Sequence, residues 1–134
     1  MREEIEIEEK DAEVILPIFS DPSFLFPNLL KAESVKVEGK SFSAIIPLSF
    51  LSGTITVQGN VYAGASQVRY IFFVVGFDKG GIIEISAGEG KLKIKVEIDA
   101  PLGFISERTL KSRLEKFKRN AEEIIRLERI RRKI

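Results

Sequence analysis

The chain has 134 residues, 44% of them hydrophobic, and a formal net charge of +1. This length suits one small domain, and the apolar fraction is large enough to bury a core. The sequence contains no cysteine and no histidine, which excludes disulfides, thiolate or imidazole metal ligands, and Cys or His catalysis.

The first predicted element is a strand. Residues 4–8 read Glu-Ile-Glu-Ile-Glu, an alternation that leaves one face apolar. The acidic start of the chain lacks the apolar run of a signal peptide, and no stretch reaches the roughly 18 apolar residues of a transmembrane helix. We therefore expect a cytoplasmic protein with no stable membrane insertion.

Two short helices are predicted next. Asp11 is placed to cap an apolar helix over residues 12–19, in which Pro17 would disturb the last turn. Asp21 is placed to cap a second helix that ends near Leu30, because Pro22 suits the first helical position, where no amide hydrogen is needed.

Alternating segments then predict six meandering antiparallel strands, at residues 32–38, 41–51, 54–63, 66–77, 81–87 and 90–99. Five gaps suit two-residue hairpins: Gly39-Lys40, Ser52-Gly53, Gly64-Ala65, Asp78-Lys79 and Gly88-Glu89. The resulting registers place one apolar set on a single face. They put Gly59 opposite Tyr70 and Leu48 opposite Val57.

Charge places the first strand beside the last. Glu4, Glu6 and Glu8 would face Lys91, Lys93 and Lys95 across neighbouring strands, which predicts a seven-stranded sheet. A long helix then starts at the Ser106 cap and is rich in basic residues. Its apolar stripe is predicted to cover the sheet and comprises Leu110, Leu114, Phe117, Ala121, Ile124, Leu127, Ile130 and Ile134.

This order of elements, together with Ser20-Asp21-Pro22 through Pro27-Asn28 between the short helices, resembles the START-like or SRPBCC superfamily, which includes birch-pollen-allergen-like proteins. The resemblance implies an α+β helix-grip fold over residues 1–134 as a single domain. In that fold a curved seven-stranded antiparallel sheet wraps the C-terminal helix. The charge-rich, amide-poor and cysteine-free composition is typical of thermophiles, so the chain is similar to a thermophilic archaeal branch of unknown function.

The superfamily resemblance implies a cavity for lipids, sterols, hormones or polyketides between sheet and helix. The inward sheet face shows no carboxylate pair, no Arg clamp and no catalytic constellation. We therefore expect non-catalytic binding or transport of a hydrophobic, lipid- or isoprenoid-like molecule, with no catalytic residue, cofactor or metal. The expected ligand-binding residues are Tyr70, Phe72, Val57, Leu48, Ile46, Ile85, Ile94, Phe117, Ala121 and Ile124.

Several alternatives stay open. The Tyr70 hydroxyl could orient a ligand, or it could bond a main-chain group. If side chains fill the core completely, the protein would instead be a protein-interaction module or a homodimer. It would act through an outward apolar ridge at Ile71, Phe73, Val75, Phe77 and Ile82. A cyclase- or dehydratase-type enzyme that uses cavity shape and Tyr70 is a further alternative. The basic residues of the C-terminal helix are predicted to lie on a solvated face and to form ion pairs within the helix. We therefore expect no nucleic-acid partner.

Overall fold

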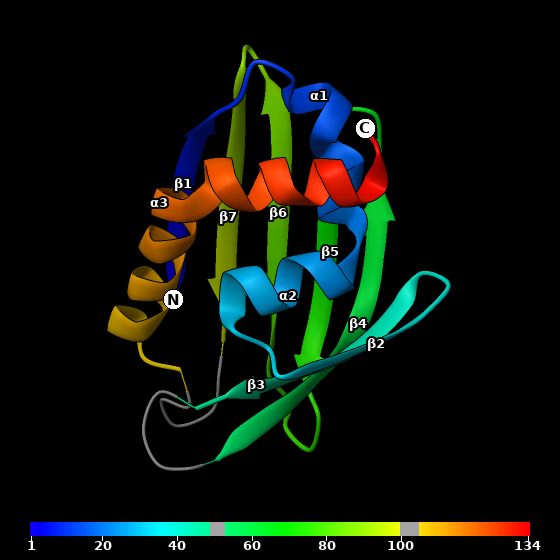
Figure 1. Ribbon diagram of the computed structural model, residues 1–134. Helices are drawn as coiled ribbons and strands as arrows, with labels where there is room; N and C mark the ends of the chain where they lie inside the picture. Colours follow the sequence, from blue (N-terminus) through cyan, green and yellow to red (C-terminus); the bar gives the residue numbers. More distant parts are fainter. Residues whose placement is uncertain (49–52, 100–104) are drawn as a thin grey trace.

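The computed structural model describes residues 1–48, 53–99 and 105–134 (Figure 1). The helices are α1 (Ala12–Ile15), the 3-10 helix η1 (Leu16–Ser20), α2 (Pro22–Leu30) and α3 (Glu107–Arg132). The strands are β1 (Arg2–Glu8), β2 (Ser34–Glu38), β3 (Ser41–Pro47), β4 (Thr54–Ala63), β5 (Gln67–Val74), β6 (Gly80–Gly88) and β7 (Lys91–Ile98).

The strands form one seven-stranded antiparallel sheet in the order β1-β7-β6-β5-β4-β3-β2. Figure 1 shows α2 and α3 on the same face of this sheet, with the C-terminal end of α3 beside α1. This arrangement confirms the predicted helix-grip fold. Its physical reason is that a sheet with one apolar face and an amphipathic helix must cover each other.

The charge argument for the first strand is also confirmed. Glu4 lies opposite Lys95, Glu6 opposite Lys93 and Glu8 opposite Lys91. Glu4 Oε1 lies 3.5 Å from the Lys93 Nζ atom, a diagonal ion pair. These exposed ion pairs contribute little energy. We therefore attribute the stability of the β1–β7 pairing mainly to the buried apolar side chains on the other face of the two strands.

Four of the five predicted turns are wrong, and each error shifts the register by an even number of residues. Ile46 lies opposite Ile55, Gly59 opposite Phe72, and Tyr70 opposite Val61. Residues 49–52 lie outside the described part of the chain. Because side chains alternate with a period of two, an even shift leaves the same apolar set on the same face.

The β6–β7 hairpin shows why a turn was misplaced. Its central residues are Glu89 and Gly90, with φ values of 53° and 71°. A two-residue turn with positive φ at both positions matches the twist of the strands it joins. Glycine adopts this conformation readily at Gly90, whereas the predicted turn Gly88-Glu89 would have ended one residue earlier.

The helix starts follow the predicted signals in two cases out of three. Asp21 accepts a hydrogen bond from the Ser23 amide at 2.9 Å, and Ser106 accepts one from the Thr109 amide at 3.1 Å. Asp11 precedes α1 but makes no side-chain capping bond. The helix that starts there changes to a 3-10 helix at Leu16, next to Pro17, as the missing amide hydrogen predicts.

The apolar stripe of α3 is confirmed only in its first half. Leu110, Leu114, Phe117 and Ala121 are buried, and the stripe continues through Ile125 rather than Ile124, which is half-buried. Leu127, Ile130 and Ile134 are exposed, so their assignment to the core-facing stripe was wrong. Successive residues turn by about 100° around a helix, which carries Leu127 and Ile130 away from the face of Ile125, and Ile134 lies beyond the end of α3 at Arg132.

Ion pairs hold the last turns of α3 in place of apolar contacts. Arg129 pairs with Asp11 at 3.1 Å, and Arg132 pairs with Asp21 at 2.6 Å. Asp21 therefore caps α2 with one carboxylate oxygen and binds α3 with the other. No helix in the described part of the chain is both long and apolar enough to cross a membrane.

Candidate functional site

The concave face of the sheet gathers the residues expected to bind a ligand. Leu48 and Ile124 are partly buried and pack against the same apolar cluster that contains the others. The buried members of the expected set are Tyr70, Phe72, Val57, Ile46, Ile85, Ile94, Phe117 and Ala121. Five strands (β3 to β7) and α3 contribute to it, so only the tertiary fold brings these positions together.

Aromatic side chains from α2 and η1 fill much of this concavity. The Phe26 ring lies 4.8 Å from the Phe42 ring, 5.5 Å from Tyr70 and 5.9 Å from Phe72. The Phe19 ring meets Phe117 of α3 edge-on at 6.3 Å. Helices η1 and α2 therefore fill the space between the sheet and α3, and we call these two helices the plug. A ligand in this space would displace part of the plug.

The Tyr70 hydroxyl bonds the main chain of that plug. It donates to the Phe19 carbonyl at 2.6 Å, and the side chain has no exposed surface. Burial, and secondarily the negative charge of Asp21, raises the pKa of the Tyr70 hydroxyl far above its usual range. The hydroxyl therefore remains a donor that ties β5 to η1 at any physiological pH.

A groove runs between α2 and α3 and opens to the surface. It has a volume of about 190 Å³. The residues that line it are Pro27, Asn28, Leu29, Lys31, Arg113, Lys116, Phe117, Asn120 and Ile124. Two of them, Phe117 and Ile124, belong to the expected ligand-binding set, so this groove connects the surface with the edge of the apolar core.

Arg113 is the buried charged residue of this groove. The residue is 8% exposed, and its guanidinium donates to the carbonyls of Leu30 and Pro47, both at 3.1 Å. It thereby joins the C-terminal end of α2 to the end of β3. Burial lowers the pKa of the Arg113 guanidinium, although an arginine remains charged at neutral pH.

Arg113 was not predicted as a site residue, because the basic side chains of the C-terminal helix were all expected to lie on its solvated face. The residue lies three positions after Leu110 and next to Leu114, within the helix face that turns inward. This spacing from Leu110 and Leu114 was the sequence signal that could have predicted a buried Arg113. A charged residue inside an apolar stripe suggests a buried polar partner, here two main-chain carbonyls.

A second hollow flanks α3 on its other side, against β1. It is wide, about 910 Å³, and is lined by mixed charges around Ile7, Ala121 and Ile125. Ala121 is the expected ligand-binding residue that lies there. Because α3 is flanked by hollows on both sides, its contact with the sheet is narrow and depends on the buried stripe.

The outer face of the sheet bears the predicted apolar ridge. Ile71 and Phe73 of β5 are 43% and 51% exposed, and Ile82 lies beside Ile71 on β6. The strand ends at Val74, so the predicted strand over 66–77 was too long. Exposed Val75 and Phe77 belong to the following turn.

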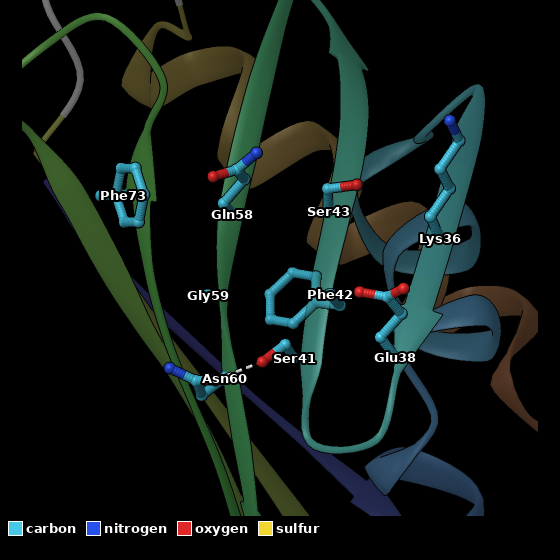
Figure 2. A pocket seen from close by; sticks show the side chains of 9 residues that line it. All are labelled: Lys36, Glu38, Ser41, Phe42, Ser43, Gln58, Gly59, Asn60 and Phe73. Atoms are coloured by element: carbon cyan, nitrogen blue, oxygen red, sulfur yellow. Dashed lines mark hydrogen bonds between the residues drawn. The ribbon is translucent and has the colours of Figure 1, made fainter.

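Phe73 forms one side of a trough on this outer face (Figure 2). The trough measures about 510 Å³, and Lys36 and Glu38 of β2 stand across it from Phe73. Its remaining lining residues are Ser41, Phe42, Ser43, Gln58, Gly59 and Asn60. Hydroxyl and amide groups therefore separate the Phe73 ridge from the β2 edge.

Comparison with other proteins assigns the family. A family model described as "-like:-like" matches residues 1–134. A hypothetical protein from Sulfolobus tokodaii has 35% sequence identity and a TM-score of 0.83, and the match covers 98% of this chain and 99% of that chain. The chain belongs to this family. No curated protein is significantly similar in sequence.

More distant structures share the fold alone. A protein from Deinococcus radiodurans has a TM-score of 0.59 at 17% identity, with 90% of this chain and 95% of that chain covered. Ara h 8.0201, of the birch-pollen-allergen-like fold, has a TM-score of 0.54 at 20% identity, with 93% and 95% covered. These likenesses confirm the helix-grip architecture that the sequence predicted.

Proposed function

We propose that the protein binds a small apolar molecule between α3 and the concave face of the sheet, with access along the α2–α3 groove. The observation that carries this proposal is the lining of the groove, which includes the buried core residue Phe117 and the half-buried Ile124 packed against the core. The resemblance to the START-like superfamily supports the same role.

The size of the groove limits the ligand. A cavity of about 150 Å³ lined by apolar side chains holds one benzene, and pockets for drug-sized molecules exceed about 300 Å³. The groove of about 190 Å³ therefore accommodates one ring or a short alkyl chain. A larger lipid or isoprenoid requires α2 to move. Pro27 inside α2 weakens that helix, because it supplies no amide hydrogen for the helical ladder.

Binding of a neutral probe tests the proposal. Native mass spectrometry and organic extraction of the purified protein would reveal an apolar molecule that co-purifies, and titration with n-octanol would measure affinity. We expect Ile124→Trp, which fills the groove, to weaken octanol binding by about tenfold or more. Ile130→Trp is the matched control, because Ile130 is 61% exposed on the same helix and outside the groove lining.

Two results would contradict this function. The first is the absence of both an extractable apolar compound and any octanol binding. The second is equal loss of octanol affinity in both tryptophan variants, which would indicate a general disturbance of α3.

A second candidate function is self-association through the Phe73 ridge, since contiguous exposed apolar side chains mark interaction sites. Sedimentation equilibrium would then show a dimer that Phe73→Ser abolishes. Tyr62→Ser is the control, because Tyr62 is equally exposed, at 51%, on the neighbouring strand β4. A wild-type monomer at millimolar concentration would remove this candidate.

A further inference from the structure

We propose that the α2–α3 groove binds the carboxylate of an acidic amphiphile, a molecule with a short apolar chain and one anionic end. This inference rests on the proposed function and deepens it, because it names the chemical class of the ligand. It is carried by the charges of the groove, by the surroundings of Arg113 and by the apolar floor beside them.

Among the residues that the structure describes, cations line the groove and no carboxylate does. Lys31, Arg113 and Lys116 contribute three positive charges, and Asn28 and Asn120 contribute amides. The C-terminal end of α2 offers these cations a partial negative charge of only about one half. The groove therefore keeps a positive excess that an anion would neutralise.

Arg113 lacks an acidic partner although it is buried. Among the described residues no Asp or Glu forms an ion pair with it, and the sequence places no acidic residue in segments 49–52 and 100–104. Its hydrogen bonds to Leu30 and Pro47 engage two of the five N–H donors of a guanidinium. Buried charges are normally paired, and a planar fork of donors suits a carboxylate.

Apolar groups lie next to these charges. Pro27, Leu29, Phe117 and Ile124 line the same groove as Arg113 and the two lysines. An alkyl chain against these side chains would leave its carboxylate near the cations. A free inorganic anion would gain only the electrostatic part of this interaction, so the combined lining favours an amphiphile.

Paired probes of equal chain length test the inference. We expect octanoate to bind wild-type protein on the order of tenfold more tightly than n-octanol at low ionic strength, and sodium chloride to reduce this preference. Chemical-shift changes of the Phe117 and Ile124 amides on octanoate binding would locate the ligand in the groove.

Charge-neutral variants identify the cations. Lys31→Gln combined with Lys116→Gln should reduce the affinity for octanoate several-fold more than the affinity for n-octanol. Lys111→Gln combined with Lys118→Gln is the control, since both lysines are exposed on α3 and outside the groove lining. The lysine variants are preferable to changes at Arg113, because Arg113 also joins α2 to β3.

The outcomes separate the two proposals. Equal affinity for octanoate and octanol overturns the inference and leaves the proposed function standing. A preference that survives the Lys31 and Lys116 substitutions also overturns it. Failure of both probes to bind overturns the proposed function and the inference together.

Discussion

Substitution of Tyr70 by phenylalanine tests how the sheet holds the plug of short helices. The change removes one oxygen, and with it the 2.6 Å hydrogen bond to the Phe19 carbonyl. Because Phe19 is fully buried, the carbonyl would lose a partner in a dry environment. Leaving such a group without its bond costs about 1–3 kcal/mol, so we expect Tyr70→Phe to be less stable by that amount.

Urea unfolding measures this loss. For a protein of this size, the cost corresponds to a fall of about 1 M in the urea midpoint. Tyr62→Phe is the matched control, because the Tyr62 side chain is 51% exposed and removal of its hydroxyl should leave the midpoint unchanged. Equal midpoints for wild type and Tyr70→Phe would refute the structural role of the hydroxyl.

The same variant predicts a difference in pH dependence. The folded state raises the pKa of Tyr70, so above pH 10, the usual tyrosine pKa, the unfolded chain loses this proton while the folded chain keeps it. Stability from this group is therefore complete below about pH 10 and falls above it, by at most about 1.4 kcal/mol per pH unit. Tyr70→Phe should lack this fall. If Tyr70 instead orients a ligand, the substitution would lower affinity without lowering stability.

Three further predictions concern stability. Gly59→Ala should lower the free energy of unfolding by about 1–3 kcal/mol, because its new Cβ would lie 2.7 Å from the Phe72 Cα atom. Gly88→Ala is the control and should cost less, since its new Cβ meets nothing within 4 Å. Equal effects of the two substitutions would contradict this prediction. Asp21→Ala should lower the free energy of unfolding by about 1–2 kcal/mol, since it removes a helix cap and an ion pair to α3. Glu123→Ala is the control, because it breaks only an exposed ion pair and should not shift the urea midpoint. From the thermophile-like composition we expect thermal unfolding in calorimetry well above the mesophilic range, and a melting temperature near 50 °C would argue against it.

Local patterns in the sequence predicted the elements and their faces. Proline after Asp21 and serine before Glu107 marked where α2 and α3 begin, because capping depends on neighbours along the chain. The alternation of charged and apolar residues at 4–8 and 91–96 predicted that the first and last strands are neighbours. These features need no distant contact to be recognised.

The alternation of apolar residues determined which side chains share the concave face, but it left the register open by steps of two, since such a step changes no side chain's face. Turn conformations settled that choice, as the positive φ values at Glu89 and Gly90 show. Likewise, helix periodicity predicted an amphipathic α3, yet packing against β1 and α2 determined where the buried stripe ends and placed Arg113 in the groove. Those outcomes depend on contacts between segments far apart in the chain, which no local pattern encodes.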